Sequence, residues 1–222
     1  MNLTVFTSCY GAKYASFLPE WEACMAELPV EALIVGDIHA QATCSGKTRF
    51  ILAPEYGSPY NQGAAHNHAA IHSRTEWLMH VGVDDLVTPD LVEQLTPHAG
   101  GADVIAVDVQ RTRNGKMGTI RENRPTTETI LEPTMGRQPL DACAAFRRSY
   151  WERTGYRTNL TGGVDVALWI DMAHQGARFA FTGKVGVIYR LRPDSLWHQR
   201  SRQNVNRVRR DLNGLRRVRR KA

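Results

Sequence analysis

The chain has 222 residues, of which 42% are hydrophobic and 23% are charged. This balance is typical of a globular protein and excludes a largely disordered chain. The formal net charge of +6 is concentrated at the C-terminus, because ten of the 28 basic residues but only one acid, Asp211, lie in 200–222. The tail therefore carries +9 and the remaining body −3, so the basic character does not describe the fold as a whole.

Short runs of β-branched and aromatic residues predict strands in the first half of the chain, at 3–7, 32–35, 49–53, 77–81 and 104–107. Between these strands, apolar residues at helical spacing predict a helix over 17–28, and the alanine- and histidine-rich segment 62–73 predicts a second. Pro89, as a first helical residue, predicts a third helix from Pro89 to Leu95. Strands that alternate with helices indicate an α/β domain with a mostly parallel sheet. In such sheets, ligands bind at the C-terminal ends of the strands.

The second half gives weaker signals. Residues 114–139 combine glycine, proline, threonine and charge with little periodicity, so we expect an irregular insertion there, on the acceptor side. A helix is predicted over 166–173, and strands at 179–181 and 185–189.

The cysteines indicate the compartment. Cys9, Cys24, Cys44 and Cys143 form no CxxC pair and no zinc-ligand spacing, which predicts reduced thiols in a cytoplasmic protein. The start of the chain is too short and polar for a signal peptide, and no run approaches the roughly 18 apolar residues of a membrane span.

Carboxylates stand at the ends of predicted strands. Asp37 follows one strand, and the adjacent pair Asp84 and Asp85 follows another. Adjacent carboxylates repel unless a cation or a donor offsets them, so the pair indicates either a ligand site or a helix N-cap. Asp165 follows two glycines and is either a helix cap or a general base.

One phosphate-loop signal is rejected. Residues 45–48, Ser-Gly-Lys-Thr, have Gln41 where a phosphate-binding loop needs a glycine, and they lack a strand–loop–helix context.

Four histidines form a loose cluster: His66, His68, His72 and His80. There is no HExxH motif, and polar histidines on a helix face are favoured over a zinc site.

A series of short motifs nevertheless runs through residues 3–198: Thr7-Ser-Cys-Tyr10, Asp37, Asn61-Gln-Gly63-Ala-Ala-His-Asn67, Val81-Gly-Val-Asp84-Asp85, Pro89-Asp-Leu-Val-Glu93, Ala144-Ala-Phe-Arg-Arg148, Gly163-Val-Asp165 and Tyr189-Arg190 with Ser195. Their order and spacing resemble the family 2 glycosyltransferases. The resemblance implies the GT-A fold, a Rossmann-like α/β fold with a mostly parallel sheet flanked by helices, over residues 1–198. A basic amphipathic helix in 199–222 would follow.

The resemblance also implies roles for the matched residues. The nucleotide-sugar donor would be bound by Thr7, Ser8, Tyr10, Asp37, Asn61, Gly63, Asn67 and Asp84. Asp84, Asp85 and His198 would hold Mn²⁺ or Mg²⁺, and Asp165 would be the general base. Residues 1–107 would form the nucleotide-sugar-binding half and 108–198 the acceptor-binding half.

The implied reaction is an inverting transfer of a sugar from a UDP- or GDP-sugar to an acceptor hydroxyl, as in a hexosyltransferase. The acceptor would be a glycan, a lipid-linked sugar or a protein. Three residues depart from the family pattern: Gly82 replaces the first Asp of Asp-x-Asp, Val164 replaces a Glu, and His66 replaces an Arg. Gly82 and Val164 favour the alternative of a non-catalytic nucleotide-sugar-binding protein, whereas Asp165 favours an enzyme.

The tail has an apolar stripe at helical spacing, formed by Val205, Val208, Leu212 and Leu215, with arginines on its other faces. This stripe favours packing on the body or on a second subunit in a homo-oligomer. Contact with an anionic membrane surface, which would make the protein peripheral at the membrane, and contact with nucleic acid remain open. The last alternative corresponds to a DNA-base glycosyltransferase that holds the duplex with its tail.

Overall fold

A computed structural model describes residues 1–132, 138–140, 142–160, 162–193 and 202–217. Its centre is a nine-stranded sheet with the order β3-β2-β1-β4-β8-β6-β9-β5, in which β7 pairs with β6. The strands are β1 (Leu3–Cys9), β2 (Glu31–Gly36), β3 (Arg49–Leu52), β4 (Trp77–His80), β5 (Leu86–Val87), β6 (Val104–Arg113), β7 (Lys116–Arg121), β8 (Ala144–Arg147) and β9 (Phe179–Arg190).

The first four strands of this order are parallel, and so is the pair β6–β9. The strands β5, β7 and β8 run antiparallel to their neighbours. The predicted α/β class with a mostly parallel sheet flanked by helices is therefore confirmed. The antiparallel β8 is inserted between β4 and β6 and joins the two parallel parts of the sheet.

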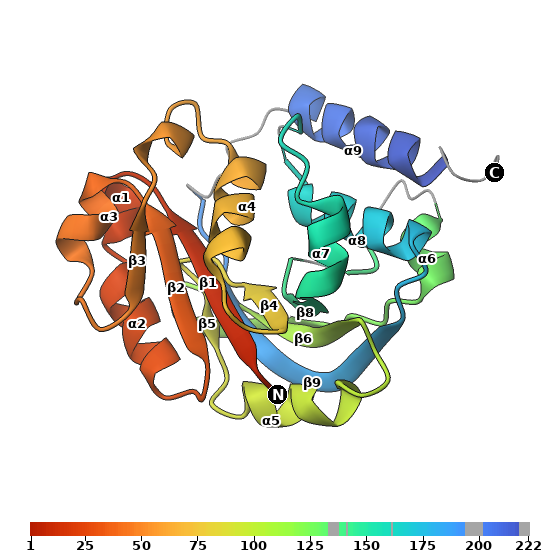
Figure 1. The fold of residues 1–222 in the computed structure, drawn as a ribbon, viewed down its shortest axis with the longest axis horizontal. Coiled ribbons are helices and arrows are strands. Elements are labelled where there is room, and N and C mark those ends of the chain that lie inside the picture. The colour runs from red at the N-terminus through yellow and green to blue at the C-terminus, as the bar shows by residue number, and fades with distance from the viewer. Residues whose placement is uncertain (133–137, 141, 161, 194–201, 218–222) are drawn as a thin grey trace.

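Helices cover both faces of the sheet (Figure 1). One face carries α1 (Ala12–Ala15), α2 (Leu18–Ala26), α3 (Ile38–Thr43) and α5 (Leu91–Leu95). The other carries α4 (Gln62–His72), α6 (Thr127–Leu131), α7 (Arg148–Thr154) and α8 (Val164–His174). Two 3₁₀ turns, Pro54–Tyr56 and Thr96–His98, lie in the connections. None of the described helices is long and apolar enough to cross a bilayer.

Side chains alternate along β1 and build a core on each face. Val5 packs with Trp21 of α2 in one core, while Phe6 packs with Trp169 of α8 in the other. All three aromatic rings are fully buried. Because successive side chains of a strand point to opposite faces, a single strand contributes to both layers.

The expectation of an irregular insertion over 114–139 was wrong in its described part. Asn114 and Gly115 both have positive φ and form the two-residue turn between β6 and β7. Asn-Gly is a strong signal for such a hairpin, and the prediction overlooked it. In α6, Thr126 and Thr129 cap the helix reciprocally. Residues 133–137 lie outside the described part.

The strands predicted at 179–181 and 185–189 form one continuous strand, β9. Gly183 has a φ of 71° in its middle, and the pairing with β6 shifts register there. The glycine and this irregularity explain why the sequence pattern breaks although the strand does not.

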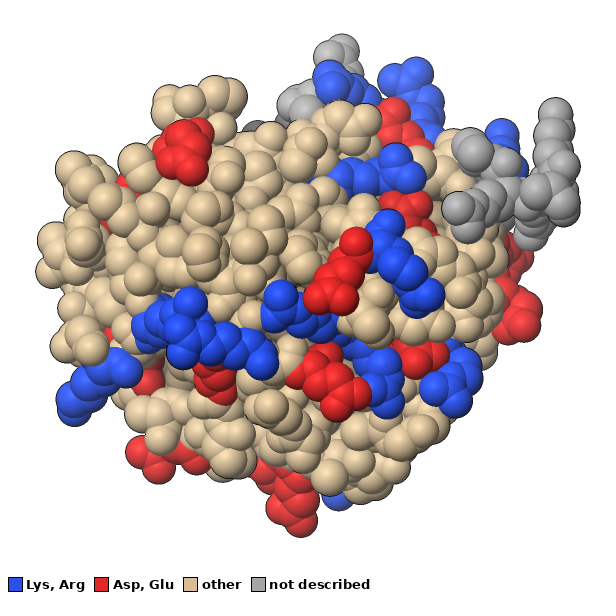
Figure 2. All heavy atoms as spheres, in the orientation of Figure 1, with Lys and Arg blue, Asp and Glu red and all other residues tan. Residues whose placement is uncertain are grey.

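The last described helix, α9 (Arg202–Arg217), packs on α8. Val208 and Leu212 of the predicted stripe are buried in the second core. The guanidinium of Arg216 is also buried and donates to the carbonyl of Ile130 at 2.9 Å. The side chain of Val205 lies outside the described part. Basic and acidic side chains lie beside one another across the middle and lower right of the face in Figure 2, so this face has a mixed charge.

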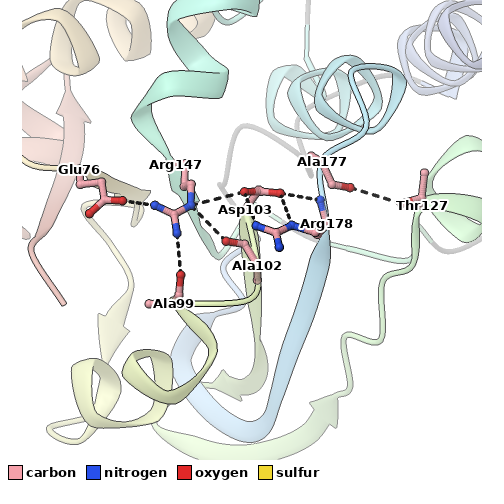
Figure 3. Close-up of polar contacts among 8 residues, drawn as sticks. All are labelled: Glu76, Ala99, Ala102, Asp103, Thr127, Arg147, Ala177 and Arg178. Atoms are coloured by element: carbon pink, nitrogen blue, oxygen red, sulfur yellow. Dashed lines mark hydrogen bonds and ion pairs between the residues drawn. The ribbon is translucent and has the colours of Figure 1, made fainter.

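A carboxylate network ties the strands together at one edge of the sheet (Figure 3). Asp103, just before β6, accepts from the backbone and the guanidinium of Arg178 at 2.9 and 3.0 Å. Its other oxygen lies 3.4 Å from Nε of Arg147, which also contacts Glu76. Arg147 pairs with Trp77 at the start of β4, so this network lies at the edge opposite the C-terminal end of β4.

Candidate active site at the C-terminal edge of the sheet

Loops after β1, β2 and β4 meet at the C-terminal edge of the parallel strands. Asp37 begins α3 there: its Oδ1 accepts from the backbone of His39 and Ala40 at 3.0 and 3.1 Å. Its Oδ2 accepts from the backbone N–H of Gly11 at 2.7 Å. The carboxylate therefore caps a helix and also fixes the loop after β1.

The residues at the end of β1 and just after it divide between the two faces of the sheet. The hydroxyl of Ser8 bonds with that of Tyr60 at 2.6 Å, and the ring of Tyr10 lies 5.4 Å from the ring of Tyr60. Thr7 is fully buried and, by strand alternation, faces the same core as Val5. The structure therefore brings Ser8 and Tyr10 together and separates Thr7 from them.

The α4 residues of the predicted donor site bind the loop before α8. The amide of Asn67 donates to the carbonyl of Tyr156, and its oxygen accepts from Nε1 of Trp151 and from the backbone of Tyr156. Asn61 caps α4 and donates to the carbonyl of Thr158. A Cβ at Gly63 would lie 2.2 Å from the carbonyl oxygen of Arg157, so only glycine fits there.

Asp84 and Asp85 occupy the turn after β4. The Oδ1 of Asp85 accepts from the backbone N–H of Arg190 at 3.0 Å, and Nη1 of Arg192 lies 3.3 Å from Oδ2 of Asp84. Burial and the charge of Asp84 raise the pKa of the Asp85 carboxyl well above its ordinary value. A Cβ at Gly82 would lie 2.8 Å from Oδ2 of Asp85, so an aspartate at position 82 would displace this carboxylate.

This turn fits a divalent cation that arrives with a diphosphate. The repulsion between Asp84 and Asp85 is the kind of interaction that a cation offsets, and Mg²⁺ commonly takes one or two carboxylates plus substrate phosphates. Arg192 already offsets part of the charge of Asp84. His198, the third predicted ligand, and Ser195 lie outside the described residues.

Asp165 lies in the first turn of α8, whose N-cap residue is Gly163 with a φ of 69°. The exposed backbone N–H groups of a helix N-terminus favour a carboxylate there. Its Oδ1 lies 3.7 Å from Nδ1 of His66 and 4.0 Å from Nδ1 of His80. A Cβ at Gly163 would lie 3.1 Å from Val208, so α9 covers the turn that presents Asp165.

Electrostatic effects show which of these groups lie near one another. Burial, together with the charges of Asp37 and Asp84, raises the pKa of the Cys9 thiol to about 12. Burial and the charge of Asp165 raise the pKa of the Tyr60 hydroxyl. The charges of Asp37 and Asp84, after β2 and β4, thus act on the Cys9 thiol at the end of β1. The charge of Asp165 acts on the hydroxyl of Tyr60, which bonds to Ser8 of the same strand.

Sequence reasoning missed several of these groups. Tyr60, Tyr156 and Arg192 belong to no motif that we recognised, and they reach the site through the folded chain. His66 and His80 lay within the predicted loose cluster, but the cluster divides: these two are buried beside Asp165, whereas His68 and His72 stack on each other, with their rings 4.8 Å apart. The prediction of polar histidines on a helix face was therefore wrong for His66.

The rejected phosphate-loop segment takes no part in the site. Glu22 of α2 accepts from the backbone of Ser45 at 2.8 Å and from its hydroxyl at 2.9 Å. The segment follows helix α3 and precedes β3, which is the reverse of the order that a phosphate-binding loop requires.

No protein-family model matches this chain, and no curated protein matches it. Solved structures do match. S. aureus TarS 1–349 in complex with UDP-GlcNAc has a TM-score of 0.68 at 13% identity, over 90% of this chain and 62% of that one. TarS 1–349 in complex with UDP has a TM-score of 0.65 at 13% identity, over 97% of this chain and 65% of that one.

The mannosyltransferase PcManGT from Pyrobaculum calidifontis, in complex with GDP-Man and Mn²⁺, has a TM-score of 0.64 at 15% identity. That match covers 96% of this chain and 69% of PcManGT. The chain thus spans less than two thirds of the TarS chains that it resembles. At such low identity the likeness establishes a shared fold, which is the GT-A arrangement implied by the motifs.

Proposed function

We propose that this chain is a glycosyltransferase that moves a sugar from a UDP- or GDP-sugar to an acceptor hydroxyl with inversion. The observation that carries the proposal is that carboxylates from three separate parts of the sequence act on groups at the end of β1: the charges of Asp37 and Asp84 on Cys9, and that of Asp165 on Tyr60, which bonds Ser8. The fold supports it, because TarS and PcManGT were solved with UDP-GlcNAc and with GDP-Man and Mn²⁺.

The donor would bind to residues 1–107. Tyr10 offers a half-buried aromatic ring beside Tyr60, and Ser8 fixes Tyr60 by a hydrogen bond. Asp37, held by Gly11, would accept from the nucleotide base. Thr7 would support this pocket from the core beneath it.

Asn61, Gly63 and Asn67 would act on the donor site as positioning residues. Their bonds and close contacts go to the backbone of 156–158, so they fix α4 against the loop that leads to α8. This joins the donor half to residues 108–198, the proposed acceptor half.

Asp165 would take the proton of the acceptor hydroxyl while the acceptor oxygen attacks the anomeric carbon from the side opposite the leaving diphosphate. Attack from that side inverts the anomeric centre. The first turn of α8 stabilises the ionised carboxylate, which is the form that accepts a proton.

Asp84 and Asp85 would hold Mn²⁺ or Mg²⁺, which when bound neutralises charge on the leaving diphosphate. Arg190 and Arg192 place further positive charge at the same turn, since Arg192 lies against Asp84 and both stack over Phe17. The acceptor would be a glycan, a lipid-linked sugar or a protein.

The test is a panel of UDP- and GDP-sugars incubated with the purified chain and Mn²⁺, with release of UDP or GDP as the readout. We expect release with one donor, and its loss in EDTA and in Asp165→Asn. Binding of a donor without release of the diphosphate in any condition, including added candidate acceptors, would favour the non-catalytic alternative. Transfer to duplex DNA, weakened by salt, would identify a DNA-base glycosyltransferase.

A further inference from the structure

Two histidines and an aspartate from three elements converge in the interior. His66 comes from α4, His80 from the end of β4 and Asp165 from the start of α8. Their exposed fractions are 0%, 8% and 7%, so all three side chains are buried. Each offers one ligand atom, and these three atoms lie within 4.8 Å of one another. Among the described residues, no other group of three histidine, cysteine or acidic side chains comes together in this way.

The histidine nitrogens show that this cluster is more than ordinary core packing. Neither Nδ1 nor Nε2 of His66 has a hydrogen-bond partner among the described residues, and neither does Nδ1 of His80. A buried polar atom without a partner costs about 1–3 kcal/mol, so folded proteins rarely leave such atoms unmatched. Both unmatched Nδ1 atoms lie beside the same carboxylate oxygen, Oδ1 of Asp165. A ligand at this point that accepts a lone pair from each Nδ1 atom would offset the free-energy cost of burying both atoms without hydrogen-bond partners.

We propose that His66, His80 and Oδ1 of Asp165 form a binding site for a transition-metal dication, with Zn²⁺ as the preferred ion. A bound Zn²⁺ would occupy the carboxylate that the proposed function uses as the base, so the zinc-bound chain and the chain that transfers sugar would be alternative states of this site. Two imidazole nitrogens and a carboxylate oxygen are a common ligand set for zinc with an open fourth position. In a tetrahedral site with bonds of about 2.0–2.1 Å, neighbouring ligand atoms lie about 3.3 Å apart. The two distances to Asp165, 3.7 and 4.0 Å, exceed this by less than 1 Å, and all three ligand atoms lie within 4.8 Å of one another, so side-chain rotations would have to bring them together around the ion.

The chemistry of the cluster selects against Mg²⁺ and for zinc. Imidazole suits zinc, copper and nickel, whereas Mg²⁺ requires oxygen ligands and retains water. Burial lowers the pKa of both histidines, that of His80 to about 4, so both rings are neutral at pH 7 and can bind a metal. The site therefore differs from the Asp84–Asp85 turn, which offers oxygen ligands.

Aromatic side chains enclose the cluster. The two imidazole rings lie 4.0 Å apart, and the rings of Phe6 and Tyr156 lie 5.6 and 4.9 Å from that of His66. The hydroxyl of Tyr156 is buried without a hydrogen-bond partner among the described residues. This enclosure limits solvent around the metal and leaves the fourth position to a water molecule or to Tyr156.

Metal binding is tested without any donor, so its outcome is independent of the proposed transfer. The EDTA-treated, dialysed full chain is titrated with Zn²⁺ alone by calorimetry at pH 7, and with Mg²⁺ in parallel. We expect one Zn²⁺ per chain, no saturable binding of Mg²⁺ at this site, and a rise in melting temperature with Zn²⁺. A wild-type chain that binds no Zn²⁺, or that binds Zn²⁺ and Mg²⁺ alike, would overturn the proposal.

Matched variants locate the site. His66→Gln, His80→Gln and Asp165→Asn should each weaken Zn²⁺ binding at least tenfold. His68→Gln and His72→Gln, on the same helix α4, should leave it within twofold of wild type. Equal losses in both groups, or no loss in the first, would place the zinc elsewhere. If a buried-histidine variant fails to fold, Asp165→Asn with the two α4 controls still decides the result.

Discussion

The two edges of the sheet use buried carboxylates in opposite ways. Asp103 at one edge and Asp85 and Asp165 at the other are 5–7% exposed, so burial does not distinguish them. Burial acts against the charge of Asp103, but hydrogen bonds from Arg178 outweigh it and lower the pKa of its carboxyl. At the C-terminal edge, burial and the charge of Asp84 raise the pKa of Asp85 instead.

The difference lies in the partners. Asp103 has its charge matched by Arg178 and Arg147 within the fold (Figure 3). Asp165 faces two neutral histidines, and Asp85 faces a second carboxylate. Charge matched inside the fold stabilises structure, whereas a second carboxylate beside a buried one, as at Asp85, favours a cationic ligand.

The largest effect is expected on catalysis. Asp165→Asn removes the proposed base and should lower the rate of sugar transfer by about 10²–10⁴-fold, the usual contribution of a positioned general base. The matched control is Asp171→Asn on the same helix, whose carboxylate pairs with Arg157 at 2.8 Å. The rates are compared at saturating donor and acceptor. A turnover of Asp165→Asn that equals that of Asp171→Asn would remove the base from the mechanism.

Stability should fall with acid in two different pH windows. Burial lowers the pKa of His80 to about 4, so the unfolded chain binds more protons than the folded chain between about pH 6.5 and 4. The free energy of unfolding should therefore decrease by about 3 kcal/mol as the pH falls through this window. For Asp103, whose pKa is lowered, the loss should come only as the pH falls below about 4.

Denaturant unfolding of the metal-free chain at several pH values measures both windows. His80→Gln should make the slope in the upper window shallower, with the remainder due to His66, whose pKa burial also lowers, and should leave the lower window unchanged. The charged and titratable neighbours of His80 in this measurement are Asp165 and His66. An unchanged slope between pH 6.5 and 4 in His80→Gln would show that this histidine does not titrate as the structure implies.

Breaking the opposite edge should cost stability and spare the site. Asp103→Ala leaves Arg147 and Arg178 without their buried carboxylate and should lower the free energy of unfolding by about 2 kcal/mol. Glu152→Ala is the control, since it removes an exposed i,i+4 pair with Arg148 that contributes about 0.3–0.5 kcal/mol. Denaturant melts provide the comparison. Equal losses in the free energy of unfolding of the two variants would mean that the network around Asp103 does not stabilise the fold.

The smallest effect concerns the turn after β4. A methyl at Gly82 would press on Asp85, so Gly82→Ala should destabilise the chain by about 1 kcal/mol. Gly100→Ala is the matched control, because a Cβ there meets nothing within 4 Å. Thermal melts of the two variants are compared. If Gly82→Ala melts no lower than Gly100→Ala, the turn has more room than the structure shows.

Much of the fold could be predicted from the sequence, because the strands and helices of the first half of the chain have strong local patterns. The runs that became β1, β2 and β4 are continuous and largely buried, and the alternation of strands with helices indicated the parallel pairing. The antiparallel β8 could not be placed from its own residues, since the register of Leu78 with Phe146 depends on contacts between distant segments. The Asn114-Gly115 turn was a local signal that could have been used.

The site was predictable only in its carboxylates. Asp37, Asp84 and Asp165 occupy ends of strands or helices, where a pattern in the sequence identifies them. The division of the histidines was not predictable, because His66 and His68 differ by two positions on one helix and only the packing of α4 on the sheet determines which is buried. Tyr60 and Arg192 reach the site through loops, for which the sequence gives no periodicity.

Calorimetric titration of UDP and GDP in the presence of Mn²⁺ tests whether the C-terminal edge binds a nucleotide sugar. Wild type, Asp84→Ala and Asp103→Asn are compared, with melts to confirm that each is folded. We predict that wild type binds one of the two nucleotides, that Asp84→Ala weakens this binding at least tenfold, and that Asp103→Asn binds as wild type does. Unchanged binding in Asp84→Ala, or no binding of either nucleotide to wild type, would contradict the account.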